Sequence, residues 1–89
     1  LPTEFALQQN YPNPFNPTTS IEYSVPSSEY VILKVYDVLG NEVVTLVNEQ
    51  KSAGHYKVSF NAINLASGLY IYRIQVGEFN SVRKMMFIK

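Results

Sequence analysis

The amino-acid sequence predicts an all-β protein, an immunoglobulin- or fibronectin-III-like antiparallel β-sandwich of about seven strands. Apolar and polar side chains alternate over several short stretches, and turn residues interrupt this pattern roughly every ten residues. No stretch has helical periodicity long enough for a βαβ unit, which excludes a parallel sheet. The chain has 89 residues, of which 46% are hydrophobic and 16% charged. This balance is that of one folded domain and not of a disordered segment.

The first elements surround a proline-rich loop. A short strand is expected around residues 5–8, and a second strand over 20–25, ended by Pro26. The segment between them, 10–19, contains three prolines. Each proline removes a backbone donor and fixes φ, and each also restricts the residue before it. We therefore predict an ordered, extended loop that is pinned by Tyr11 and Phe15.

The middle of the chain predicts two strands joined by a tight turn. Residues 30–37 carry apolar side chains on both faces, which is typical of a central strand. A turn is expected over 37–41, with Gly40 at the position that needs positive φ. The chain then resumes as a strand over 42–47, and the polar residues 48–52 are expected to form a loop.

The last third of the sequence predicts three more strands. One is expected over 55–60, followed by an irregular segment with room for one helical turn. Gly68 opens the next strand, which runs to Val76. Gly77 and Glu78 fit a two-residue hairpin loop of type II′, because glycine is favoured at its first central position. The final strand is expected over 79–88.

The residue inventory favours no catalytic, cofactor or metal site. The chain has no cysteine, so it has neither disulfides nor thiolate ligands. His55 is the single histidine and lacks the partners of a transition-metal site. Asp37 precedes a turn, where a carboxylate more often accepts backbone hydrogen bonds than it binds calcium. We expect neither an enzyme nor a cofactor-dependent protein.

Charge is zero overall but unevenly distributed. The first 50 residues hold one lysine and six carboxylates, and the last 39 hold six cations and one carboxylate. The simpler interpretation is that acidic and basic strands are neighbours and their fields cancel. The alternative is a basic C-terminal patch that a partner recognises. No basic stripe interleaved with stacking aromatics indicates nucleic acid, and no apolar run is long enough to span a membrane.

Tyrosines raise a second question, because seven are present. Tyr70 and Tyr72 share one face of a predicted strand with Ile74. An exposed row of tyrosines would suggest sugar binding, whereas the same spacing is more often core packing. Tyr11, in the proline loop, is the tyrosine expected to be most exposed.

Several segments, in order along the chain, together resemble one known family. They are Asn10–Thr19, Val35–Gly40, Thr45–Val47, Ala53–Tyr56, Leu65–Tyr70 and Arg83–Met86, with Ile21, Tyr23 and Pro26 following the first of them. In sequence letters the first reads NYPNPFNPTT, the second VYDVLG and the fifth LASGLY. Each piece is unspecific by itself, but their ordered combination resembles the type A C-terminal sorting domain of the type IX secretion system.

The resemblance implies an immunoglobulin-like fold and a role in secretion. In that family the domain lies at the C-terminus of a larger cargo protein and directs it across the outer membrane. A sortase-like peptidase usually removes it, and the cargo is then secreted or anchored at the cell surface. The partners implied are the outer-membrane machinery and this peptidase. The sorting-motif candidates carried over are Pro12, Asn13, Pro14, Asp37, Leu39, Gly40, Gly68, Tyr70, Lys84 and Lys89.

The chain is therefore expected to be one domain over 1–89, excised from the end of a larger secreted protein. Within it, the Leu69–Lys89 hairpin is predicted to be the part that the secretion machinery recognises, since an edge strand can pair with a strand of a receptor. A non-catalytic carbohydrate-binding or adhesion module remains the alternative. A purely structural immunoglobulin-like domain, resembling that of the flagellar hook-cap protein, is the third possibility.

Overall fold

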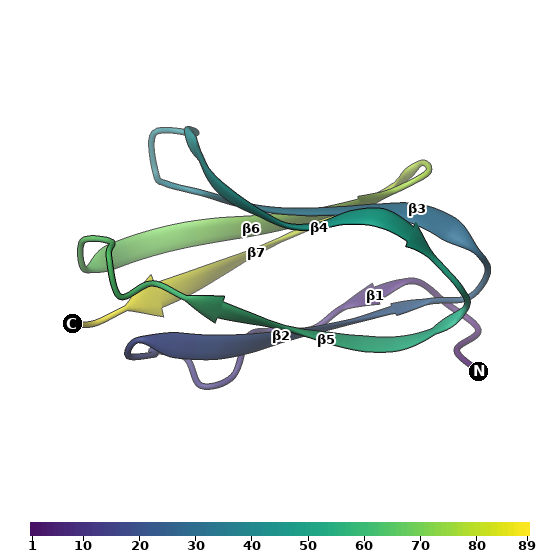
Figure 1. Ribbon diagram of the computed structural model, residues 1–89, viewed down its shortest axis with the longest axis horizontal. Helices are drawn as coiled ribbons and strands as arrows, with labels where there is room; N and C mark the ends of the chain where they lie inside the picture. Colours follow the sequence, from purple (N-terminus) through teal and green to yellow (C-terminus); the bar gives the residue numbers. More distant parts are fainter.

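A computed structural model describes residues 1–89 and contains strands, turns and no helix (Figure 1). The structure therefore has no helix that is long and apolar enough to cross a membrane. The seven strands are β1 (Ala6–Leu7), β2 (Thr18–Val25), β3 (Glu29–Tyr36), β4 (Glu42–Lys51), β5 (Gly54–Asn61), β6 (Gly68–Val76) and β7 (Phe79–Phe87).

The strands form two stacked antiparallel sheets. One sheet has three strands in the order β1-β2-β5, and the other has four in the order β4-β3-β6-β7. This division is that of a fibronectin-III-like sandwich, with the fourth strand paired to the third. The predicted fold class is confirmed, and β3 lies inside its sheet between β4 and β6, as its two apolar faces indicated.

The core lies between the sheets and is built by period-two alternation. In β2 every second residue is buried, and β3 and β6 follow the same pattern. Tyr72 and Tyr23 are the largest fully buried side chains. Tyr70 is only 8% exposed, so the tyrosines of β6 are core residues and not a ligand platform.

Two local predictions are wrong. Residues 48–51 continue β4 as a regular ladder with the start of β3, from Ile32↔Asn48 to Glu29↔Lys51, instead of forming a loop. Their polar side chains suit a solvent-facing edge strand, and so they resembled loop residues. Between β5 and β6 no helical turn forms. Ala62 accepts a hydrogen bond from the Leu65 amide at 2.9 Å, which closes a β-turn.

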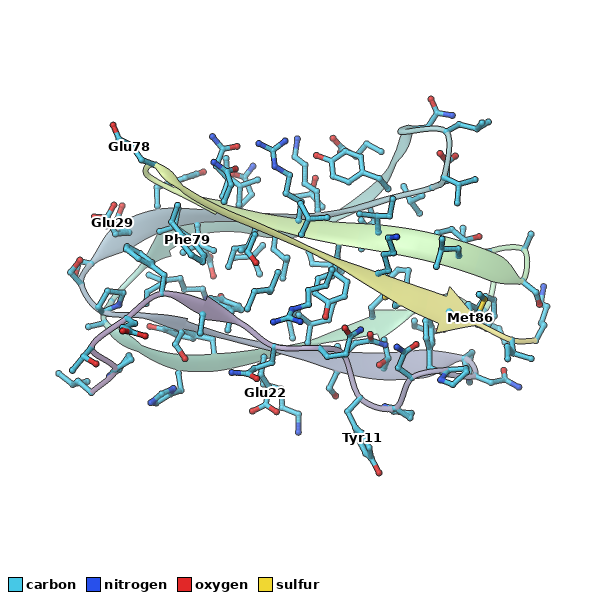
Figure 2. The ribbon with its side chains drawn as sticks, turned by 180° about the vertical axis from the view of Figure 1, so that it is seen from behind. Tyr11, Glu22, Glu29, Glu78, Phe79 and Met86 are labelled. Atoms are coloured by element: carbon cyan, nitrogen blue, oxygen red, sulfur yellow. The ribbon has the colours of Figure 1, made fainter.

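The sandwich has two long sides along which edge strands of the two sheets face each other, and these sides differ. On one side β1 faces β7; we call it the β1–β7 seam. On the opposite side β4 faces β5; we call it the β4–β5 seam. Figure 1 views the molecule from the β4–β5 seam, and Figure 2 views it from behind, with β7 and β1 in front.

Candidate functional site

The proline-rich segment closes the β1–β7 seam. Its Tyr11 forms both backbone hydrogen bonds with Ser20 of β2, at 3.0 and 2.9 Å. Phe15 reaches the other sheet: its amide donates to the Met86 carbonyl at 3.0 Å, and its carbonyl accepts from the Ile88 amide at 3.1 Å. The loop is therefore ordered and pinned at Tyr11 and Phe15, as predicted. It also joins the two sheets, which was not predicted, and we call residues 10–19 the bridging segment.

Side chains fix the bridge from both ends. Phe15 is 2% exposed and packs on Phe87 and Phe60, with ring centroids 5.3 and 6.0 Å apart. Buried Asn10 donates to the Thr19 hydroxyl at 3.0 Å, and that hydroxyl donates to the Pro12 carbonyl at 2.8 Å. Tyr11, in contrast, is 81% exposed (Figure 2), so only its backbone pins the loop.

The C-terminal strand is held along its outer edge. The Gln9 side chain donates through Nε2 to the Lys84 carbonyl at 2.7 Å, and Asn13 Oδ1 accepts from the Met86 backbone amide at 3.0 Å. Further along β7, Arg83 Nε donates to the Leu7 carbonyl at 3.0 Å. Asn13 of the Pro-Asn-Pro element (residues 12–14) thus contacts Met86, which lies between the basic candidates Lys84 and Lys89, although the two are 73 positions apart in sequence.

Asp37 organises the turn between β3 and β4. Its Oδ1 accepts hydrogen bonds from the Leu39 and Asn41 amides at 2.9 and 3.0 Å, and its carbonyl accepts one from Gly40. The Asn41 backbone hydrogen bond, aided by the Asn41 side chain and the Leu39 amide, lowers the pKa of this carboxyl. Gly40 has φ +88°, where a side chain would be strained. These contacts agree with the predicted capping role.

Gly68 and Tyr70 form a tyrosine corner at the start of β6. The Tyr70 hydroxyl donates to the Ala66 carbonyl four residues upstream, at 2.7 Å. This contact is the one found at the corresponding corner of immunoglobulin-like sandwiches. Gly68 has φ +153°, and a Cβ there would meet nothing within 4 Å, so the constraint is the backbone conformation and not space.

The motif candidates divide into fold residues and exposed residues. Asn13, Asp37, Gly40, Gly68 and Tyr70 hold turns, strand ends and the seam by the contacts above. The side chains of Pro12, Pro14, Leu39, Lys84 and Lys89 are exposed. The Asp37 turn, the start of β6 and the C-terminus lie at one end of the sandwich, on the left in Figure 1.

Several residues of this arrangement were not found from the sequence. Gln9 and Arg83 hold the seam through hydrogen bonds to distant backbone carbonyls. Asn10 bonds to nearby groups, the Pro12 carbonyl and the Thr19 hydroxyl. Ser67 accepts a hydrogen bond from the Lys89 amide at 2.8 Å. The available signal was an amide-rich stretch beside prolines, since such side chains commonly satisfy backbone groups in irregular segments.

Few side chains in the structure are placed for catalysis or metal binding. The Ser24 hydroxyl and His55 Nδ1 lie 2.9 Å apart, but on an exposed strand face where no carboxylate hydrogen-bonds the ring. A serine nucleophile needs an oriented base and an oxyanion site as well. No three His, Cys, Asp or Glu residues are placed to hold a metal ion. Burial raises the pKa of the Tyr72 phenol, whose hydroxyl donates to the Gln8 carbonyl as a structural contact.

Fold and site together define a small β-sandwich module whose motif residues serve turns, strand ends and a seam instead of a reactive cluster. The model of the secretion system C-terminal sorting domain family matches residues 9–89. The chain therefore belongs to the type IX secretion C-terminal sorting domain family, and it carries a signal for export to the cell surface or beyond. Neither a curated protein nor a solved structure is similar enough to the chain to match it.

Proposed function

We propose that this domain directs a cargo protein, fused upstream of it, across the outer membrane through the type IX machinery. A sortase-like peptidase then removes it, and the cargo is anchored at the surface or released. The family match over 9–89 supports this proposal most strongly. The domain acts as a recognition module in it and performs no chemistry.

The Leu69–Lys89 hairpin remains the element that we propose the secretion machinery recognises. Only part of its edge strand is available to pair with a receptor strand. A receptor strand added to β7 needs free backbone groups on its outer edge. In antiparallel pairing alternate residues point these groups away from the neighbouring strand. Those of Met86 and Ile88 are occupied by the bridging segment, whereas those of Asn80 and Val82 have no partner. The Lys84 carbonyl already accepts a hydrogen bond from the Gln9 side chain. The Asn80–Val82 part of β7 is therefore the portion free for strand addition.

The test is a reporter with an inner-membrane export signal, fused upstream of the 89-residue chain in a bacterium with type IX secretion. We expect the reporter outside the outer membrane, shortened by about the 10.1 kDa of the domain. An unrelated fibronectin-III-like sandwich in its place should leave the reporter periplasmic. Equal export with both domains would refute the sorting function. Export without shortening would refute removal alone.

Hairpin recognition is tested by substitution and not by truncation. Deleting residues 84–89 would remove Met85 and Phe87, which are 1% and 0% exposed, and would unfold the domain. Lys84→Ala with Lys89→Ala removes exposed charge only. We expect reduced export with an unchanged unfolding midpoint. Undiminished export of this variant would contradict the charge role of the hairpin.

A further inference from the structure

The two outer faces of the sandwich have opposite character. The outward side chains of β2 and β5 are all polar, and they pair as Ser20–Ser59, Glu22–Lys57 and Ser24–His55. None of the chain's exposed large hydrophobic residues lies on β1, β2 or β5. The outer face of the three-stranded sheet therefore has the composition of a simply solvated surface.

The outer face of the four-stranded sheet is apolar and basic. We call it the basic sheet face and define it by Ile32, Lys34, Tyr36, Ile71, Arg73 and Lys84. Five of the nine exposed large hydrophobic residues lie on it or on the turn beside it: Tyr30, Val38, Leu39, Val82 and Met86. Val82 is 55% exposed and Leu39 83%. The outer face of the three-stranded sheet carries no such side chain, so exposed apolar surface is concentrated on one of the two faces, as at an interaction site.

Two of the three cations that define this face, Arg73 and Lys84, lack carboxylate partners. Lys34 forms an ion pair with Glu42 at 2.9 Å. Arg73 lies beside Lys34 in the ladder, and its guanidinium donates only to the Asn80 side-chain oxygen, at 2.8 Å. Lys84, opposite Ile71 on β7, forms no ion pair. Two positive charges thus stay uncompensated among apolar side chains.

The backbone is raised at both ends of this face. In Figure 1 the Asp37–Asn41 turn rises above the sheet at one end, and the β6–β7 hairpin rises at the other. Figure 2 shows long side chains with nitrogen tips projecting between them, and Glu78 at the hairpin end. A shallow hollow of about 70 Å³ lies between β3 and β6, lined by Lys34, Tyr36 and Arg73 among others.

We propose that the basic sheet face is the docking surface for the export receptor, a protein that presents aliphatic side chains together with carboxylates. Arg73 and Lys84 supply the charge complementarity, and Ile71, Val82 and Leu39 supply the apolar contact. The inference rests on the proposed sorting function and adds the partner's chemistry. Arg73, which lies outside the sorting motifs carried over from the family, becomes a recognition residue.

Other occupants fit this face less well. A second copy of the chain would bring the uncompensated Arg73 and Lys84 of both molecules to the same interface, where like charges oppose association. A polysaccharide platform needs exposed coplanar rings, but Tyr36 is half-buried and the Tyr30 hydroxyl is already bonded to Asn48.

Export of the reporter fusion gives the first test. Arg73→Glu and the Arg73→Glu/Lys84→Glu pair should lower export about tenfold or more, since like charge would then face the receptor's carboxylates. Lys57→Glu makes the same charge change on the opposite face and should export normally. Unchanged unfolding midpoints of all variants exclude misfolding. Normal export of the double variant, with the parent domain exported, overturns the docking proposal and leaves the sorting function intact.

Crosslinking in the same cells identifies the class of partner. A benzophenone amino acid replaces Ile71 on the basic sheet face or Ser59 on the opposite face. We expect a protein adduct from position 71 only, which disappears in the Arg73→Glu/Lys84→Glu background. An adduct with a second copy of the fusion, or with lipopolysaccharide and no protein, overturns the proposal. Failure of the unmodified fusion to be exported at all refutes the sorting function instead.

Discussion

The two seams of the sandwich differ in how far the chain covers the gap between the two sheets. The β1–β7 seam is closed by the chain itself, through the bridging segment, the Arg83 contact with Leu7 and the stack of Phe5 on Phe79 at 5.0 Å. The β4–β5 seam is left as an open cleft of about 300 Å³, lined mainly by apolar residues such as Val44, Leu46 and Leu65. No segment of the chain bridges it.

This difference shows what the N-terminal motif residues do. The closed seam contains the Pro-Asn-Pro element and the last strand, whereas the open seam contains none of the motif candidates beyond the turn that precedes β4. Contacts such as Asn13 with Met86 join residues 73 positions apart. The bridging segment therefore holds the C-terminal strand in place, so that the basic sheet face keeps β7 as its outer strand.

The largest expected effect is that of Phe15→Ala. It removes the buried ring that anchors the bridge between Phe60 and Phe87. The free energy of unfolding should fall by about 3–5 kcal/mol, because a cavity replaces a large core side chain. Urea denaturation followed by tyrosine fluorescence measures it.

The matched position at the open seam is Leu65, which is half-buried. Leu65→Ala should cost no more than about 1–2 kcal/mol, since its side chain already borders solvent in the cleft. Equal losses from the two substitutions would show that the closed seam is no better packed than the open one, and the contrast would be lost.

Tyr72→Phe tests the closed seam by deleting one oxygen. The hydroxyl is fully buried and donates to the Gln8 carbonyl at 2.6 Å. We expect a loss of about 1–1.5 kcal/mol in the free energy of unfolding, the usual value of such a hydrogen bond. Tyr30→Phe is the control: that hydroxyl donates to Asn48 beside the open side and is exposed. This substitution should change the free energy of unfolding by less than about 0.5 kcal/mol. A larger loss from Tyr30→Phe than from Tyr72→Phe would contradict the proposed difference between the two seams.

The contrast also separates what sequence could predict from what it could not. Period-two patterns located six long strands, because alternate burial dictates that spacing in a sandwich. The end of β4 was missed, since polar edge residues at Asn48–Lys51 carry no apolar alternation. The seam contacts of Gln9 and Asn13 were also missed. They join side chains to backbone groups of a strand more than 70 residues away, and no local pattern encodes that pairing.

Asn13→Ala should have a smaller effect, confined to one end of β7. It removes the acceptor of the Met86 amide at an exposed position, so we expect a loss of about 0.5–1 kcal/mol. Hydrogen exchange at the Met86 amide should speed up, while the Ile88 amide, bonded to Phe15, stays protected. Asn64→Ala, in the open cleft, is the control and should leave both amides unchanged. Equal acceleration of both amides in Asn13→Ala would mean that the whole bridge had detached.

The smallest effect is expected at the turn that leads into the open seam, and it depends on pH. Hydrogen bonds from Asn41 and Leu39 lower the pKa of Asp37 below its ordinary value of 3.8. A carboxyl with a lowered folded-state pKa stabilises the protein above its unfolded-state pKa, and this stabilisation is lost as the pH falls through the folded-state value. The midpoint of thermal unfolding should therefore drop below about pH 4, and Asp37→Asn should flatten this part of the profile.

Glu42→Gln is the control, because the pKa of Glu42 is lowered chiefly by Lys34 on the sheet face. It should leave the exchange of the Leu39 and Asn41 amides unchanged. An acid profile of Asp37→Asn that superimposes on the parent would show that the Asp37 turn contributes nothing to positioning β4, and that the open seam owes its shape to the β3–β4 ladder alone.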